Sequence, residues 1–297
     1  MVKILIVGHI TIDQIASYNR VLTSLGGPPS YVGLMATRLG AQVDAATKVG
    51  LDFPEQYLLF LSRYINLLSA SLSYTKPTTR FLLQQQGDDR TIKLIARCED
   101  IEENQIISRN YDICVLNPVA GEVSAKVAAA SKNSAKCLFM DPQGFLRRFD
   151  SEGFCTLSSM DKDLLKDVDV LKVDYEEMRC ITGLQDPQQA LSELHKLGPK
   201  LVILTAHRGY VTISTSKSIY KIPIPEYEGE KEVTGAGDIL VGAFAATYAQ
   251  NMDVLWAGCV GVSAASLSVR GVGISKIPSR EDVLQFAEGI FRGVEIY

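Results

Sequence analysis

The segment Glu232-Val-Thr-Gly-Ala-Gly-Asp-Ile-Leu-Val-Gly-Ala-Phe-Ala-Ala-Thr-Tyr-Ala-Gln250 places a single carboxylate, Asp238, between a glycine-containing loop and a long uncharged run. The small and apolar residues after Asp238 predict a buried helix that begins near this aspartate. A helix N-terminus exposes unpaired N–H groups and carries a partial positive charge, and preceding glycines let an anion approach the backbone. We therefore expect residues 234–237 to bind a phosphate.

Asp238 is expected in the first turn of this helix, where its carboxylate can accept a proton from a hydroxyl. Phosphoryl transfer requires this combination of backbone donors for the developing charge and a base for the nucleophile. The alternative is an ordinary capped helix, in which Asp238 only interacts favourably with the helix dipole. No Walker lysine follows the glycines and the GxGxxG spacing is absent, so these two nucleotide-binding fingerprints are excluded.

Short apolar runs recur along the chain with helical segments between them, which indicates the fold class. The expected strands are residues 3–7, 113–116, 137–140, 168–173 and 201–205. The expected helices are residues 29–39, 54–67, 122–131, 187–197, 239–252, 254–269 and 280–291. This alternation predicts an α/β fold with a doubly wound, mainly parallel sheet flanked by helices.

One region interrupts the alternation. Residues 79–95 hold two β-like runs around Gln86-Gly-Asp-Asp89, a pattern typical of a hairpin. Together with a strand near residues 10–15, this hairpin is expected to form a small separate sheet. A second hairpin is expected at residues 210–222. Because no linker or repeat is visible, we expect residues 1–297 to form one domain with a hairpin insertion.

The composition excludes several classes of partner. A net charge of −4 on 297 residues gives no basic footprint for nucleic acid. The longest uncharged runs, residues 239–252 and 254–269, fall short of the ~20 residues that a membrane helix needs. The six cysteines form no CxxC pair, so zinc-site spacing is absent and reduced thiols in the cytoplasm are expected.

Four motifs, in the same order along the chain, resemble the PfkB, or ribokinase-like, family of carbohydrate kinases. They are Gly8-His-Ile-Thr-Ile-Asp13 with the following glycine-rich residues 25–40, Lys172-Val-Asp-Tyr-Glu-Glu177, Leu204-Thr-Ala-His-Arg-Gly209 and Thr234-Gly-Ala-Gly-Asp238. The resemblance spans nearly the whole chain. It implies a ribokinase-like fold with a small β lid, ATP as phosphate donor and Mg²⁺.

The chain departs from the family pattern at several positions. Val233 stands where the family usually has Asp, Asp174 where it has Asn, and Ala206 where it has Gly. Within the family, Asn117-Pro-Val-Ala-Gly-Glu-Val123 and Asp141-Pro-Gln-Gly-Phe-Leu-Arg147 resemble segments of the archaeal myo-inositol kinases. The departures put the substrate and the details of metal binding in question.

The resemblance also implies roles for individual residues. Asp238 is the expected base, with an anion hole of N–H groups from Gly235, Ala236 and Gly237. The acceptor is expected to contact Asp13, Gly26, Gly27, Gln143 and Arg147, with Arg148 as a competitor for the last role. Asp13 suits this role because a carboxylate can accept hydrogen bonds from two vicinal hydroxyls, and a turn cap is its alternative. The nucleotide is expected near Thr205, Gly209, Thr234 and Ser263, and Mg²⁺, through water, near Glu177 and Asp174.

The expected activity is ATP-dependent phosphorylation of a small polyol, myo-inositol or a related cyclitol or sugar. A nucleoside kinase of the same fold is an alternative, since Tyr31, Tyr74 and Phe81 could form an aromatic slot for a base. A non-catalytic ligand-binding relative is a second alternative, supported by Val233 and Ala206. His9, His195 and His207 share no metal-like spacing and are expected to be structural. The sequence leaves open whether the protein is a monomer or a homodimer.

Overall fold

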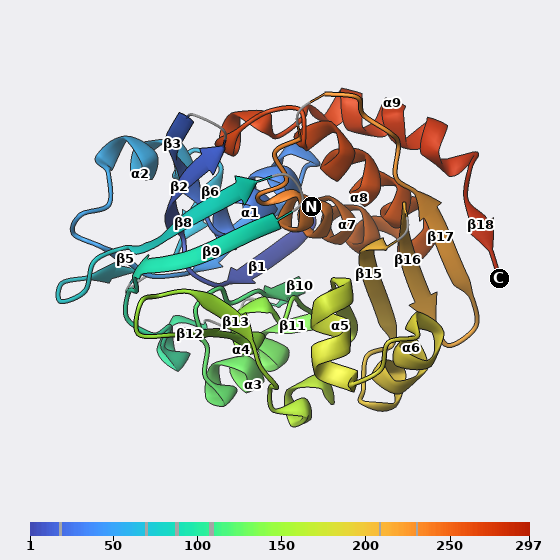
Figure 1. The fold of residues 1–297 in the computed structure, drawn as a ribbon, viewed down its shortest axis with the longest axis horizontal. Coiled ribbons are helices and arrows are strands. Elements are labelled where there is room, and N and C mark those ends of the chain that lie inside the picture. Colours follow the sequence, from blue (N-terminus) through green and yellow to red (C-terminus); the bar gives the residue numbers. More distant parts are fainter. Residues whose placement is uncertain (18–19, 69–70, 87–88, 107–109, 208, 230) are drawn as a thin grey trace.

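The centre of the fold is a sheet that, in the described residues, has ten strands in the order β18-β17-β16-β15-β14-β11-β10-β1-β4-β6 (Figure 1). This computed structural model describes residues 1–297 except 18–19, 69–70, 87–88, 107–109, 208 and 230. The strands are β1 (Lys3–Val7), β4 (Gln42–Ala46), β6 (Ile65–Leu67), β10 (Tyr111–Leu116), β11 (Ala135–Met140), β14 (Val170–Val173), β15 (Leu201–His207), β16 (Tyr210–Thr215), β17 (Ile219–Pro223) and β18 (Glu295–Ile296). Pairing is parallel from β6 to β15 and antiparallel from β15 to β18.

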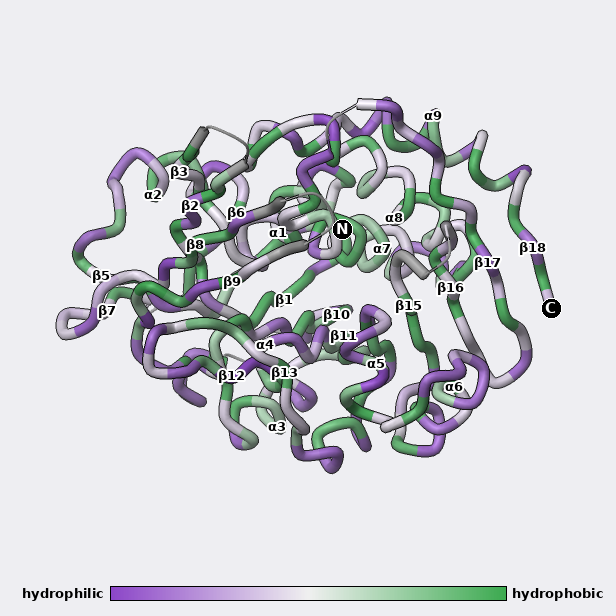
Figure 2. The backbone as a smooth tube through the Cα atoms, in the orientation of Figure 1, coloured by the Kyte–Doolittle hydropathy of each residue, from purple (hydrophilic) through white to green (hydrophobic). Residues whose placement is uncertain are grey.

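Helices cover both faces of this sheet, because successive strand residues point to opposite sides. In β1, Ile4 and Ile6 pack into one hydrophobic cluster, and Leu5 and Val7 pack into the other. The first cluster holds α1 (Pro28–Arg38), α7 (Ala236–Asn251), α8 (Val254–Ser268) and α9 (Arg280–Phe291), and the second holds α3 (Ala125–Ser134), α5 (Tyr175–Thr182) and α6 (Pro187–Lys196). Figure 2 shows the apolar strand β1 between these layers and polar residues on the outer helix α6. The predicted doubly wound α/β fold is confirmed.

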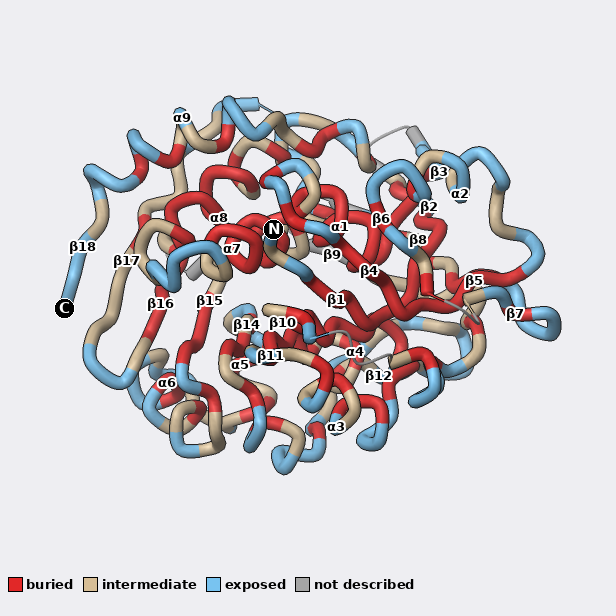
Figure 3. Tube along the Cα trace, turned by 180° about the vertical axis from the view of Figure 1, so that it is seen from behind, coloured by how far each residue is buried: buried red, intermediate tan, exposed pale blue. Residues whose placement is uncertain are grey.

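The helices α7 and α8 are apolar on all sides, a pattern typical of helices buried within a protein. Figure 3 shows that both helices are buried along most of their length. Among the described residues, no helix combines the length and the apolarity that crossing a membrane requires.

Two predicted helices differ from the structure. The helix expected at residues 54–67 ends early, as α2 (Glu55–Leu61), because the following residues form β6 and complete the sheet beside β4. The helix expected from residue 122 begins at Ala125, after the N-cap Ser124. Glu122 is instead buried, and its carboxylate accepts hydrogen bonds from the backbone N–H groups of His9, Val119 and Ala120.

A second sheet of four strands, in the order β3-β2-β8-β9, holds the hairpin region. Its strands are β2 (Thr11–Ser17), β3 (Arg20–Gly26), β8 (Thr79–Gln86) and β9 (Asp89–Ala96), and residues 87–88 of the expected turn lie outside the described residues. The sequence analysis did not predict β3. Phe81 and Leu83 pack with Val119 and Ala120 of the loop that follows β10. The remaining elements are short: β5 (Val49–Gly50), β7 (Leu72–Ser73), α4 (Gln143–Leu146), β12 (Arg147–Phe149), β13 (Cys155–Leu157) and the 3₁₀ turns Glu103–Gln105, Lys162–Leu165 and Gly273–Lys276.

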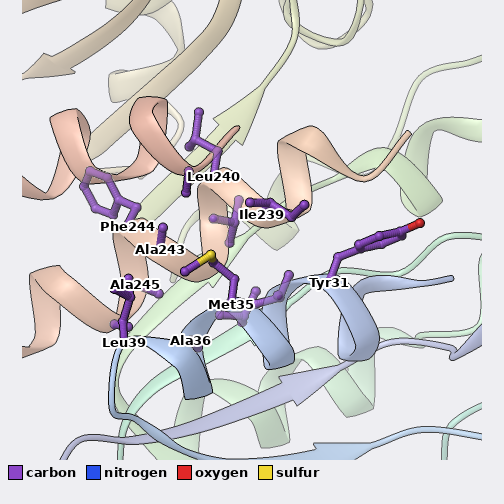
Figure 4. Packing of buried hydrophobic residues seen from close by; sticks show 14 of the residues in the cluster. Tyr31, Met35, Ala36, Leu39, Ile239, Leu240, Ala243, Phe244 and Ala245 are labelled. Atoms are coloured by element: carbon purple, nitrogen blue, oxygen red, sulfur yellow. The ribbon is translucent and has the colours of Figure 1, made fainter. Parts of the chain in front are cut away.

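The helices α1 and α7 pack against each other at very short range (Figure 4). Met35 and Ala36 of α1 lie beside Ile239 and Ala243 of α7. A Cβ atom on Gly242 would lie 2.5 Å from the backbone oxygen of Val32. Only glycine permits this approach, and the approach fixes the position of α7 over the sheet.

We expect Gly242→Ala to lower the free energy of unfolding by about 1–3 kcal/mol, because the added methyl group must separate α1 from α7. Gly289→Ala, in α9, is the matched control, since a Cβ atom there meets nothing within 4 Å. It should raise the free energy of unfolding by up to about 1 kcal/mol through helix propensity. Urea unfolding of both variants checks this, and equal shifts would contradict the close packing.

Candidate active site

The carboxyl ends of the parallel strands bring three polar side chains together. Residues Leu116, Met140 and Leu171 are register partners in β10, β11 and β14. The residues that follow them are Asn117, Asp141 and Lys172. Strand order reverses its direction between β1 and β10, which makes this edge the topological switch point where open α/β sheets bind ligands.

The loop before α7 lies at the same edge. Gly235 caps α7 with a φ of 76°, and a Cβ atom there would lie 2.7 Å from ring atoms of Tyr31, so both the conformation and the contact require glycine. A Cβ atom on Gly237 would lie 3.4 Å from Lys172 Nζ. The N–H of Ala236 already donates to the oxygen of Val233 (3.0 Å), so we leave Ala236 out of the anion hole. Gly235 and Gly237 remain as its predicted donors.

The carboxylate of Asp238 lies in the first turn of α7 and lines a pocket with these groups. Asn117 Nδ2 donates to its Oδ1 over 2.7 Å. Burial, together with the negative charge of Asp141, raises the pKa of Asp238 to about 6, while Lys172 and the Asn117 hydrogen bond act in the opposite direction. A carboxylate with a pKa near 6 is ionised at neutral pH and accepts protons more readily than an exposed aspartate.

Asn117 is itself held in place, because Gln143 Nε2 donates to its Oδ1 over 2.7 Å. Asn117 is fully buried, whereas Gln143 reaches the pocket. The chain Gln143–Asn117–Asp238 therefore fixes the orientation of the Asn117 amide, and with it one oxygen of Asp238. Only the second oxygen of Asp238 remains for a hydroxyl.

Lys172 supplies positive charge beside the anion hole. Its Nζ lies 2.9 Å from Asp141 Oδ2 and 3.8 Å from Glu177 Oε2. Burial favours the neutral amine, but the carboxylates of Asp141 and Glu177 outweigh burial and raise the pKa of Lys172. Burial also disfavours the charged form of Glu177, and for a carboxyl group this raises the pKa. The cluster therefore keeps one ammonium group close to Gly237.

Asp174 and Glu177, the predicted metal residues, form a reciprocal cap at the start of α5. Asp174 Oδ1 accepts from the Glu177 N–H and Glu177 Oε2 accepts from the Asp174 N–H, both over 2.8 Å. Both side chains line the pocket. The described residues hold no cluster of three or more His, Cys, Asp or Glu side chains that could bind a metal ion directly. This donor set fits Mg²⁺ held through water, since Mg²⁺ keeps several waters and takes further ligands from phosphates.

The pocket continues from Asp238 to the four-stranded sheet and has a volume of about 140 Å³. Asp13 is almost fully buried there, and its Oδ1 accepts from Thr11 Oγ1 over 2.8 Å. A Cβ atom on Gly26 would lie 2.0 Å from Asp13 Oδ2, so Gly26 makes room for this carboxylate rather than for a ligand. Gly27, with a φ of 82°, lines the pocket itself.

Arg147 and Arg148 point in different directions. Arg147 lines the pocket and donates to the oxygen of Val119 over 3.3 Å. Arg148 donates to the backbone oxygens of Phe145 and Ser159 on the exposed side. Of the two arginines, Arg147 alone is placed to contact a ligand.

The predicted nucleotide residues lie on different elements. Thr234 lines the pocket, Thr205 lies near the end of β15, and Gly209 lies in the turn between β15 and β16. Ser263 is fully buried between α8 and α9 and donates to the oxygen of Val283 over 2.7 Å. It cannot close over a base, so the prediction that Ser263 binds the nucleotide is wrong. The side chains of residues 206–208, which include His207, lie outside the described residues.

The other two histidines have structural partners, as expected. His9 is buried between Thr79 Oγ1 and the oxygen of Glu99, each 2.8 Å away. The two ring nitrogens of His195 form hydrogen bonds with the backbone oxygen of Pro199 and with Ser214 Oγ.

The sequence analysis did not assign roles to Asn117, Asp141 or Lys172. All three lie at the carboxyl ends of predicted parallel strands. Such ends meet at one edge of a sheet, so a survey of the polar residues there would have found them.

We expect Asn117→Leu to raise the pKa of Asp238 above about 6, because a hydrogen bond to the charged form is lost. Asn66→Leu is the control, since Asn66 Nδ2 makes a similar bond to Asp44 Oδ1 (3.0 Å) outside the pocket. The carboxyl ¹³C shift of Asp238, titrated by NMR, measures the pKa. An unchanged titration in Asn117→Leu would show that this bond does not set it.

Comparison with known proteins identifies the family of the chain. A model described as pfkB family carbohydrate kinase matches residues 1–280. The chain is 25% identical to a cytidine kinase of Thermococcus kodakarensis over 259 residues, which cover 84% of this chain and 90% of the relative.

Two solved structures share the fold. One is a pyrophosphate-dependent kinase in the ribokinase family complexed with a pyrophosphate analog and myo-inositol (TM-score 0.82, 20% identity, 95% of this chain and 99% of that chain). The other is Arabidopsis thaliana ribokinase complexed with ribose and ATP (TM-score 0.78, 19% identity, 97% and 99%). With the match over residues 1–280, these findings show that the chain belongs to the pfkB family of carbohydrate kinases, phosphotransferases that act on hydroxyl groups of sugars or nucleosides.

Proposed function

We propose that this kinase transfers the γ-phosphoryl group of ATP to one hydroxyl of a small polyol, myo-inositol or a related cyclitol or sugar. The observation that carries the proposal is a single small pocket that joins hydroxyl-binding groups to a buried base. Asp13, Gln143, Arg147 and Asp238 all line it. Carboxylate, amide and guanidinium groups together accept and donate hydrogen bonds, as several neighbouring hydroxyls require.

In the proposed reaction, Asp238 takes the proton of the acceptor hydroxyl as its oxygen bonds to the phosphorus of the donor. The bond from this phosphorus to the leaving oxygen breaks, and the remaining phosphate departs. The N–H groups of Gly235 and Gly237 stabilise the charge on the transferred group, and Lys172 adds positive charge beside them. Mg²⁺, held through water by Glu177 and Asp174, supplies further charge neutralisation when bound.

The pocket supports a polyol more than a nucleoside. About 140 Å³ is close to the size of a cavity that holds one six-membered ring, whereas a nucleoside has a base and a sugar. Of the three aromatic residues considered for a base slot, Tyr74 is 75% exposed and does not line the pocket. Tyr31 lines the pocket, but its ring packs against Gly235. Phe81 lines the pocket but also packs against Phe149, with 6.0 Å between ring centroids.

A nucleoside kinase is the second candidate, and one observation favours it. The similar cytidine kinase acts, by its name, on a nucleoside. Phe81, Leu83 and Ile92 form an apolar wall that a base could contact. The non-catalytic alternative has less support, because Asp238 and the glycines of the anion hole are in place.

The donor is proposed as ATP, with Thr205 and Gly209 near the nucleoside end. Pyrophosphate is the alternative, since a similar structure belongs to a pyrophosphate-dependent kinase.

We further propose that the four-stranded sheet closes over the acceptor and excludes water. Cysteines 98, 114, 137, 155, 180 and 259 are free thiols, which supports a cytoplasmic location.

Turnover of a panel of acceptors with either donor tests the substrate proposal. Myo-inositol, other cyclitols, sugars and nucleosides are each assayed with ATP and with pyrophosphate. The expected result is the highest kcat/KM for a cyclitol or sugar with ATP. The highest kcat/KM for cytidine, or for pyrophosphate, would replace the acceptor or the donor proposed above.

We expect Asp238→Asn to lower kcat about 10²–10⁴-fold with the best acceptor, because the positioned base is lost. Asp253→Asn is the control: Asp253 caps the neighbouring helix α8, where Asn caps equally well, so kcat should not change. Steady-state kinetics at pH 8 measure both. A kcat within a few-fold of wild type in Asp238→Asn would exclude Asp238 as the base.

A further inference from the structure

A buried ion pair lies directly before the anion-binding loop. Lys276 Nζ donates to both the backbone oxygen and the Oε2 atom of Glu232, each over 2.9 Å. The Lys276 side chain is fully shielded from solvent and that of Glu232 is 12% exposed. Lys276 belongs to the segment between α8 and α9, far from Glu232 in sequence.

The same carboxylate holds the first residue of the loop. Glu232 Oε1 accepts from the N–H of Thr234 over 2.7 Å, while its Oε2 binds Lys276. The Glu232 N–H donates to the oxygen of Val269 over 3.0 Å. The entry to the loop is therefore tied at several points to the segment after α8.

Tyr31 connects this pair to the floor of the anion hole. The Lys276 ammonium lies 6.0 Å from the centroid of the Tyr31 ring, within the range of a cation–π contact. The same ring lies against Gly235, where no Cβ atom would fit. Displacement of Lys276 would therefore remove its contact with Glu232, at the start of the loop, and its contact with the Tyr31 ring, on which Gly235 lies.

Packing alone does not explain why the Glu232–Lys276 ion pair is buried at this position. A buried ion pair is often no more stabilising than apolar residues of similar size. Val233, at the position where the resembling motif has an acid, is 36% exposed, and the carboxylate comes from the preceding residue. Neither Glu232 nor Lys276 lines the pocket, so any effect on chemistry passes through the loop.

We propose that Glu232 and Lys276 are positioning residues that hold residues 234–237 in the conformation that binds the transferred phosphoryl group. This inference rests on the proposed phosphoryl transfer at Asp238. Backbone donors accelerate the reaction only when they are fixed where charge develops. The acceptor contacts, Asp13 and Gln143, lie on other elements, so the pair affects kcat more than the KM of the acceptor.

The test compares Lys276→Met with Lys132→Met. Lys132 pairs with Asp169 over 2.9 Å, away from the pocket, and serves as a control for the loss of a lysine ion pair, with Asp169 still paired to Lys200. Lys276→Met should lower kcat at least about 10-fold, since loss of one oxyanion donor costs about 10²–10³-fold. The acceptor KM should stay within about two-fold, and Lys132→Met should leave both constants unchanged. A kcat within two-fold of wild type in folded Lys276→Met overturns the proposal.

Hydrogen exchange gives a readout that needs no turnover. In Lys276→Met, the amides of Thr234 and Ala236, which donate to Glu232 Oε1 and to the oxygen of Val233, should exchange at least about 10-fold faster, as expected when local structure opens more often. Lys132→Met should leave their exchange unchanged. Equal exchange of these amides in wild type and Lys276→Met overturns the proposal. If the wild type phosphorylates no acceptor, the proposed function fails, and the exchange comparison still tests the positioning role.

A double variant covers the case in which Lys276→Met does not fold. Glu232→Gln with Lys276→Met leaves no isolated buried charge and keeps an oxygen that can accept from the Thr234 N–H. It should fold, with faster exchange of the Thr234 and Ala236 amides and a lower kcat than wild type. Wild-type exchange and wild-type kcat in the double variant would show that the ion pair does not position the loop.

Discussion

The close approach of α7 to α1 is the constraint on which the site depends. Gly242 allows the α7 backbone to rest on Val32, and Gly235 allows the loop before α7 to rest on the Tyr31 ring. Both contacts are made by glycines that have no room for a side chain. Together they fix the height and the direction of the α7 N-terminus above the carboxyl ends of β10, β11 and β14. Asp238 acquires its place from this packing.

The electrostatics of the site follow from the same placement. The α7 N-terminus is brought over a row of side chains in which Asp141, Glu177 and Asp238 share the positive charge of Lys172. Burial and Asp141 make the Asp238 carboxylate more basic, and Asn117 and Lys172 keep it ionised near neutral pH. The site thus joins a base and a cation within one desolvated region.

The sequence predicts the features that depend on local pattern. Uninterrupted apolar strands such as residues 3–7 and the uncharged helices after Asp238 and Asp253 were recognisable because burial on all sides leaves an unambiguous composition. β6 was missed because it has only three residues and its partner β4 lies far away in the sequence. β3 pairs with the neighbouring β2, and it was missed because the consecutive Val21 and Leu22 are both exposed, so no alternation of apolar and polar residues marks the strand. Asp238 and Gly235 were predicted because they belong to a short glycine motif that is visible in the local sequence. The Gln143–Asn117–Asp238 chain needed the alignment of β10 with β11. Ser263 was misplaced because the sequence does not show which face of α8 packs on α9.

Asp13 and Asp238 belong to different parts of the fold. Asp13 lies in the four-stranded sheet, in register with Phe81, whereas Asp238 stands above the ten-stranded sheet. An acceptor that bonds to both carboxylates therefore spans the two sheets and becomes part of the connection between them. The binding energy of hydroxyls that do not react can then help to set the distance between the reacting oxygen and its base. Discrimination among acceptors would arise in the rate of transfer as well as in affinity.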